Sequence, residues 1–212
     1  MSSFIRILLV VSICWSCSSD EQEPTMVTPT ERRTTIPDPA FEQALIDLGI
    51  DNELDGTVLT SRLEGETTLL LADKNISNLT GIADFVDLEN IRASNNPITT
   101  VDVSRNTTLL FIKLENTPLS SINVSTLTAL EKLELGGSAL QNIDLSNNAK
   151  LQLFDADNTS LSSLDVSQNP ELFTLDVRNT ALNCIQVSDD QLENTPLNWT
   201  IDDTTTLNTT CN

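Results

Sequence analysis

Apolar residues recur along most of the chain with a spacing of 21 residues. One column of this repeat is Val or Leu and is always followed by serine; its members are Val103, Val124, Leu145, Val166 and Val187. Five further apolar columns keep the same spacing, so each unit reads L-x-x-L-x-L-x-x-x-x-L-x-x-I-x-V-S. The first unit is one residue longer, near Gly81, which leaves about five and a half units. Six columns in one register predict a protein built of stacked repeats.

Within each unit, a close apolar pair such as Leu133 and Leu135 alternates with polar residues. This alternation predicts a short strand with one face inward. A unit of this length cannot bury these side chains alone, so neighbouring units must cover each other. Columns of Leu, Ile and Val then form the core, at roughly 1.5–3 kcal/mol for each buried side chain. An aliphatic core agrees with the composition, which has six Phe, two Trp and no Tyr.

The unit resembles the leucine-rich repeat of short-repeat, internalin-like bacterial surface proteins, over residues 66–188. The resemblance implies a solenoid of the α/β-horseshoe class, with one short parallel strand per repeat on a concave face where ligands usually bind. The family has asparagine at the ninth position of the unit, where this chain has Asn96, Thr117, Ser138, Thr159 and Thr180. Asparagine more often stands one place earlier, at Asn95, Asn116, Asn158 and Asn179. Either the hydroxyls or the displaced asparagines can satisfy the backbone groups of the turn.

The ends of a solenoid expose apolar edges, so we expect an N-terminal cap over residues 36–65. Asp38 followed by proline is typical of a helix start, and a glycine at the far end predicts a capping helix over residues 38–49. The acidic turn at 51–55 imitates the start of an EF-hand calcium loop, but Arg62 stands where that loop has a bidentate Glu. An acidic turn is therefore favoured over a calcium site.

The first 17 residues, MSSFIRILLVVSICWSC, are too short to span a membrane, which takes roughly 20 apolar residues. They resemble a bacterial lipoprotein signal, in which a peptidase cuts before a cysteine that is then acylated. The resemblance implies a signal peptide over residues 1–16 and lipid attachment at Cys17, followed by a flexible acidic tether over residues 17–35. The acids from Asp20 to Glu23 resemble the export tag of lipoproteins on the outer face of the outer membrane. The alternative is a plain secretory signal with an incidental cysteine.

Two further cysteines, Cys184 and Cys211, lie in a C-terminal segment that departs from the repeat. An exported protein meets oxidising conditions. We therefore expect a disulfide between these cysteines that ties a C-terminal cap, residues 189–212, to the last repeat, with Trp199 packed beneath it. The alternative is two free thiols.

The chain carries a formal net charge of −20 and has no histidine. Phosphate backbones repel such a surface, so nucleic acid is not expected as a partner. Without histidine, the chain lacks the usual general base near neutral pH, the commonest zinc ligand and any Ser-His or Cys-His nucleophile pair. We therefore expect no catalytic residues, no metal and no cofactor, and we predict that the chain is not an enzyme.

The residues that flank each buried strand position should face outward and are the candidate ligand-binding residues. They are Arg92, Phe111, Lys113, Lys132, Glu134, Leu153, Asp155, Asp176 and Arg178. Phe111 and Leu153 are apolar at positions that should face solvent, so they are either anchors of an interface or scattered exposed side chains. We predict a lipid-anchored module of the outer membrane that faces the cell exterior and binds an unidentified protein. The alternatives are a structural envelope protein and a carbohydrate adhesin, although Tyr and Trp are scarce.

Overall fold

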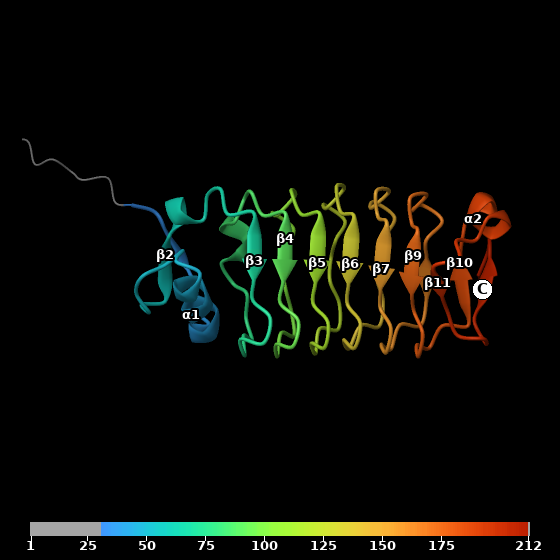
Figure 1. Ribbon diagram of the computed structural model, residues 1–212, viewed down its shortest axis with the longest axis horizontal. Helices are drawn as coiled ribbons and strands as arrows, with labels where there is room; N and C mark the ends of the chain where they lie inside the picture. Colours follow the sequence, from blue (N-terminus) through green and yellow to red (C-terminus); the bar gives the residue numbers. More distant parts are fainter. Residues whose placement is uncertain (1–30, 212) are drawn as a thin grey trace, which may run out of the picture. The chain divides into compact units, whose positions relative to one another are not determined.

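A short strand forms around the first residue of the apolar pair in each repeat, and these strands pair in parallel with one strand of the C-terminal cap into a seven-stranded sheet (Figure 1). Its members are β3 (Thr68–Leu70), β4 (Asn90–Arg92), β5 (Phe111–Lys113), β6 (Lys132–Glu134), β7 (Leu153–Asp155), β9 (Thr174–Asp176) and β11 (Trp199–Thr200). The register joins equivalent positions of neighbouring units, as it does for Ile112, Leu133 and Phe154. The predicted solenoid of parallel strands is confirmed.

The computed structural model describes residues 31–211, which belong to one unit. The predicted signal peptide, the predicted lipid attachment at Cys17 and most of the predicted tether lie outside these residues. Within the described range, no helix combines the length and the apolar character that crossing a membrane requires.

The interior of the stack is aliphatic, and the six apolar columns of the repeat line it. Leu133 and Leu135 have no exposed surface. Of the two residues that flank Leu133 in the same unit, Lys132 is exposed and Glu134 is half-buried. Each unit covers the apolar edge of the next, which is why a core forms without large aromatic clusters.

The N-terminal cap contains the predicted helix, α1 (Pro39–Asp47), whose first turn is capped by Asp38. One Asp38 oxygen accepts hydrogen bonds from helix amides at 2.8 and 3.1 Å. The other accepts three from Ser77 and Asn78 of the first repeat, at 2.7–2.8 Å. Burial would raise the pKa of Asp38, but these hydrogen bonds outweigh it and lower the pKa. One carboxylate therefore starts the helix and joins it to the solenoid.

Residues 33–35, which we placed in the tether, instead form β1 (Arg33–Thr35), an antiparallel partner of β2 (Thr57–Leu59). The cap begins there because Thr34 is buried and its hydroxyl bonds Asp84 at 2.7 Å. Two 3₁₀ turns, at 60–62 and 82–84, flank the start of the array.

The acidic turn at 51–55 is organised around a carboxylate. Glu42 of α1 is buried, and its Oε1 accepts hydrogen bonds from the amides of Asp55, Gly56 and Thr57 at 2.6–3.1 Å. The Arg33 guanidinium donates a hydrogen bond to the Asp55 carboxylate at 2.9 Å. Converging N–H groups attract an anion, so this geometry favours the acidic turn over the calcium loop.

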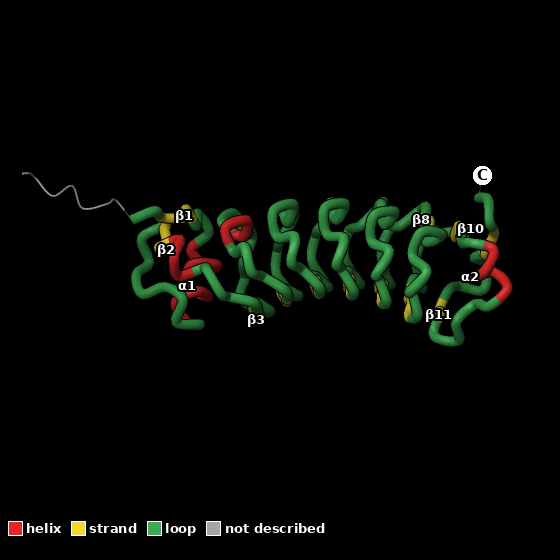
Figure 2. Tube along the Cα trace, turned by 90° about the horizontal axis from the view of Figure 1, so that it is seen from above, coloured by secondary structure: helices red, strands yellow, loops and turns green. Residues whose placement is uncertain are grey.

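The C-terminal cap extends both sides of the stack. β11 adds to the sheet beyond β9. On the opposite side (Figure 2), β8 (Leu164–Asp165), β10 (Cys184–Gln186) and β12 (Thr206–Asn208) form a second parallel sheet. The helix α2 (Asp189–Glu193) connects the two sides and begins with a capping box of Ser188 and Gln191. The predicted disulfide between Cys184 and Cys211 is present, and the half-buried Trp199 packs against the core from β11.

Threonine hydroxyls satisfy the turn after three strands, whereas the buried Ser138 hydroxyl at the equivalent place has no partner, and the displaced asparagines have another role. A hydroxyl donates to the carbonyl three residues earlier, at 2.8–2.9 Å, from Thr117, Thr159 and Thr180. At the equivalent position of an earlier unit, the Asn96 amide donates to three carbonyls. The displaced asparagines adopt left-handed backbone, with φ between 53° and 58°. Asparagine tolerates this conformation better than most residues.

A second asparagine column lies inside the stack. Asn106, Asn148 and Asn169 are fully buried, and Leu127 occupies the equivalent place in the remaining unit. Each amide donates to two carbonyls of the preceding unit, at 2.8–3.1 Å. Gln191 does the same for the cap, at 3.0 Å. The apolar pattern did not reveal this column, although its spacing is visible in the sequence.

Candidate functional site

The outward side of the seven-stranded sheet, here called the strand face, carries the predicted ligand-binding residues. Alternate residues of a strand point to opposite sides, and neighbouring strands lie about 4.8 Å apart. The register therefore produces two straight rows. The first row is Asn90, Phe111, Lys132, Leu153 and Thr174. The second row is Arg92, Lys113, Glu134, Asp155 and Asp176.

The structure brings all nine candidates together on this face. None of them is buried: Arg92, Lys132 and Arg178 are exposed and the other six are half-buried. The residues between them on the strands, such as Ile112 and Leu133, are fully buried. Their role in binding stays a prediction.

Two cations in the N-terminal half of the strand face, Arg92 and Lys113, have partners, whereas the exposed Lys132 has no carboxylate of the described residues within salt-bridge distance. The Arg92 guanidinium lies 4.9 Å from the centre of the Phe111 ring. Lys113 donates to Glu115 at 2.8 Å and also to Glu134. Burial would lower the pKa of Lys113, but the two carboxylates raise it. The charge of Lys113 is therefore neutralised within this half of the face.

The C-terminal half of the strand face is acidic. Arg178 pairs with Asp176 at 2.6 Å, and no other cation of the described residues lies within salt-bridge distance of Asp155, Asp157 or Asp176. Burial, followed by the charges of Asp157, Asp176 and Glu115, raises the pKa of Asp155 to about 6, against a lowering hydrogen bond from the Asp157 amide. Asp155 is thus a carboxyl group whose charge is poorly compensated near neutral pH.

Two shallow depressions mark the first row. One, of about 400 Å³, is lined by both rows around Phe111, Lys132 and Leu153. The other, of about 430 Å³, is lined by Lys132, Leu153 and Phe173 among others. Leu153 contributes to both, so the two candidates Phe111 and Leu153 lie along one continuous strip.

Sequence reasoning missed three exposed apolar residues of this region. Phe173 is 62% exposed and Leu197 is 101% exposed. Each stands two residues before a paired position, Leu175 in β9 and Trp199 in β11, so both lie at the same end of adjacent strands. Leu70 of β3 is 54% exposed beside Arg92. Phe173 could have been found from the sequence, because it is an aromatic residue just before the outward Thr174. Leu197 could not, because it lies in the segment without a repeat.

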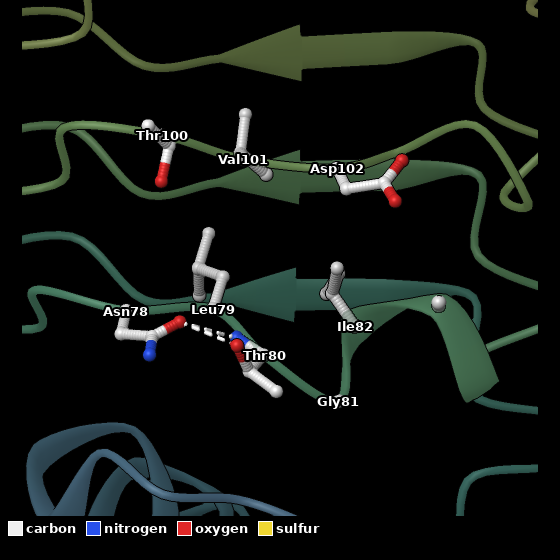
Figure 3. A pocket seen from close by; sticks show the side chains of 9 residues that line it. Asn78, Leu79, Thr80, Gly81, Ile82, Thr100, Val101 and Asp102 are labelled. Carbon is white, nitrogen blue, oxygen red and sulfur yellow. Dashed lines mark hydrogen bonds between the residues drawn. The ribbon is translucent and has the colours of Figure 1, made fainter.

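A separate hollow of about 330 Å³ lies between the first two units (Figure 3). Its polar groups bond each other, since Asn78 accepts from the Thr80 amide and hydroxyl at 2.8 and 2.7 Å. Gly81 there has a φ of 106°, and a Cβ on it would lie 2.3 Å from Cδ1 of Ile36 in the cap. The longer first unit thus allows close packing against the cap. Among residues 31–211, no group of three acids or cysteines is arranged to hold a metal ion.

No protein-family model and no curated protein matches the sequence. Among solved structures, the functional domain of InlJ from Listeria monocytogenes, which includes a cysteine ladder, superposes with a TM-score of 0.67 at 24% identity. The match covers 85% of this chain and 44% of that chain. The internalin InlF of the same organism gives a TM-score of 0.68 at 20% identity, over 86% of this chain and 60% of that chain. The chain therefore spans about half the length of these proteins, and its described part has the leucine-rich-repeat fold of the internalins.

Proposed function

We propose that the chain is a binding module at the cell surface that recognises a protein through the strand face. The observation that supports it most is the register of the sheet. It aligns half-buried apolar side chains, Phe111 and Leu153, with a row of charged residues from five separate units. Apolar anchors bordered by polar groups are typical of protein interfaces.

The chemistry of this face suits a protein better than the alternative ligands. A carbohydrate site would draw on exposed Tyr and Trp, and the chain has no Tyr. The net charge of −20 opposes nucleic acid. The likeness to internalins is one of fold, so it supports recognition by analogy only.

The proposal includes the anchor. A signal peptide over residues 1–16 would direct export, and acyl chains on Cys17 would hold the chain on the outer membrane, facing the exterior. Each buried CH₂ contributes about 0.8 kcal/mol, so two or three chains hold a protein firmly. The disulfide of the C-terminal cap supports an oxidising destination.

Capture on the immobilised full chain tests the proposal, with a variant that alters only the strand face. Phe111→Ala with Asp155→Lys removes an apolar anchor and reverses one charge in the face. The control, Leu54→Ala with Glu64→Lys, makes the same kinds of change in the N-terminal cap, where Leu54 is 57% exposed. We expect the face variant to weaken binding of the captured protein at least tenfold and the control to leave it unchanged. Equal affinity for both variants would contradict a role of the strand face, and selective capture of glycans would favour an adhesin.

A further inference from the structure

We infer that the docking centre is the C-terminal half of the strand face, and that its occupant is a basic amphipathic helix of another protein. The inference deepens the proposed function and rests on it. This inference depends on three features of the region around strands β7, β9 and β11. They are the uncompensated acidic charge, the exposed apolar residues beside that charge, and the spacing of the strands.

The charge of the face is uncompensated at its C-terminal end. In the N-terminal half, Lys113 lies between Glu115 and Glu134, and Arg92 stacks on Phe111. In the C-terminal half, Arg178 pairs with Asp176, and no cation of the described residues lies within salt-bridge distance of Asp155 or Asp157. Ammonium or guanidinium groups from a partner would relieve the repulsion between these carboxylates.

Apolar side chains border these carboxylates. Leu153 precedes Asp155 by two residues on the same strand. It lines a depression of about 430 Å³ together with Phe173, and the side chains of Lys132 and Glu171 lie at the same depression. Leu197 lies at the same end of the sheet as Phe173 and is fully exposed. Large exposed apolar side chains next to one another are typical of a protein docking site. The partner must therefore present apolar side chains beside its cations.

The spacing of the strands favours a helix in the partner. Acids of the second row stand one strand apart, at about 4.8 Å. A helix that crosses the strands advances about 5.4 Å per turn, so residues three or four apart lie over successive strands. An extended segment places same-side residues about 6.6 Å apart, which differs more from the strand spacing of about 4.8 Å than the helical repeat does.

The net charge disfavours other occupants of this surface. A second copy of the chain carries the same charge of −20, so the acidic halves of two copies repel each other. Anionic membranes and nucleic acids are repelled for the same reason. Charge complementarity therefore leaves a cationic protein segment.

Titration calorimetry on the full chain tests the inference with a synthetic peptide of Leu and Lys about five turns long, with the two residue types on opposite helix faces. A scrambled peptide of identical composition shows whether the amphipathic arrangement matters. The variant Asp155→Asn with Phe173→Ser alters the proposed centre. The variant Glu64→Gln with Leu54→Ser is its control, because it removes the same charge and a similarly exposed apolar side chain from the cap.

We expect the amphipathic peptide to bind the parent chain and the control equally, and to bind the centre variant at least tenfold more weakly. The scrambled peptide should bind at least tenfold more weakly to the parent chain. Equal affinity for the centre variant, or equal affinity of the scrambled peptide, would overturn the inference.

The same variants separate this inference from the proposed function. Suppose a protein captured on the parent chain is lost on Arg92→Ser with Phe111→Ser but is retained on Asp155→Asn with Phe173→Ser. In that case the docking centre lies in the other half, and only the present inference fails. If neither pair alters capture, the strand face does not bind and both proposals fail.

Discussion

Gly137 interrupts a column of left-handed asparagines, and filling the gap should stabilise the fold. Asn95 and Asn116 precede it in this column, and Asn158 and Asn179 follow it. Side-chain amides link these pairs, from Asn116 to Asn95 at 3.0 Å and from Asn179 to Asn158 at 3.1 Å. Gly137 has the same backbone conformation, with a φ of 68°, but offers no amide. The substitution Gly137→Asn would complete the ladder.

The magnitude follows from three contributions. Replacing glycine restricts the unfolded chain and stabilises the fold by about 0.4–1 kcal/mol. Left-handed backbone costs an ordinary residue about 1–2 kcal/mol, and asparagine less because its side chain bonds locally. New amide hydrogen bonds contribute about 0.5 kcal/mol each, the low end of the range, because the column is exposed. A Cβ at Gly137 would lie 2.4 Å from the Asn116 Oδ1, the end of a flexible side chain that can rotate to accept from the new amide.

We expect Gly137→Asn to raise the free energy of unfolding by about 1 kcal/mol, or roughly 2–4 °C in Tm, and Gly137→Ala to lower it by about 1 kcal/mol. Urea unfolding followed by circular dichroism measures both. The reverse substitution, Asn158→Gly, is the control and should cost about 0.5–1 kcal/mol. A Gly137→Ala variant as stable as Gly137→Asn would refute the reasoning, because alanine restricts the unfolded chain too but cannot join the ladder.

Three further predictions concern the cap, the acidic cluster and the anchor. Replacing Cys184 and Cys211 by serine opens a crosslink across a sequence separation of 27 and should lower the free energy of unfolding by about 3 kcal/mol in urea melts; an unchanged midpoint would contradict it. Because the pKa of Asp155 is raised in the fold, its stabilising contribution is complete below about pH 3.8 and is lost as pH rises through about 6. The free energy of unfolding of Asp155→Asn, relative to that of the parent chain, should therefore rise between about pH 4 and 7. The expected rise is about 1 kcal/mol after allowance for solvent screening of this half-exposed group. A difference that does not change with pH would disprove the shift of the pKa. Cys17→Ala should move the chain from the membrane fraction to the soluble fraction and abolish incorporation of a labelled fatty acid, and retention of either would refute the anchor.

Much of the solenoid was predictable because equivalent residues of successive units have the same surroundings. Once Leu133 and Leu135 are assigned inward, every column that shares their spacing is assigned too, and the outward row from Arg92 to Asp176 follows by alternation. The helix start at Asp38 was also local, since capping depends on a few adjacent residues. The charge on the face was therefore predictable, including its change from basic to acidic.

Contacts between distant segments were not predictable. Hydrophobicity patterns do not mark polar residues that turn inward, so the buried Asn148 and its bonds to the preceding unit went unnoticed. The strand at residues 33–35 depends on a partner more than twenty residues away, and a Thr- and Pro-rich composition masked it. Phe173 and Leu197 lie at the same end of the sheet only because β11, in a cap that has no repeat, pairs with β9.

The sequence by itself determined the period and the inward and outward sides of each strand, because both depend on side chains within one unit or its copies. Only the tertiary structure decided which charges neutralise each other and which acids keep no partner. Pairing depends on distances of a few ångströms between side chains of different units, as between Lys113 and Glu134, and a spacing along the chain does not contain those distances.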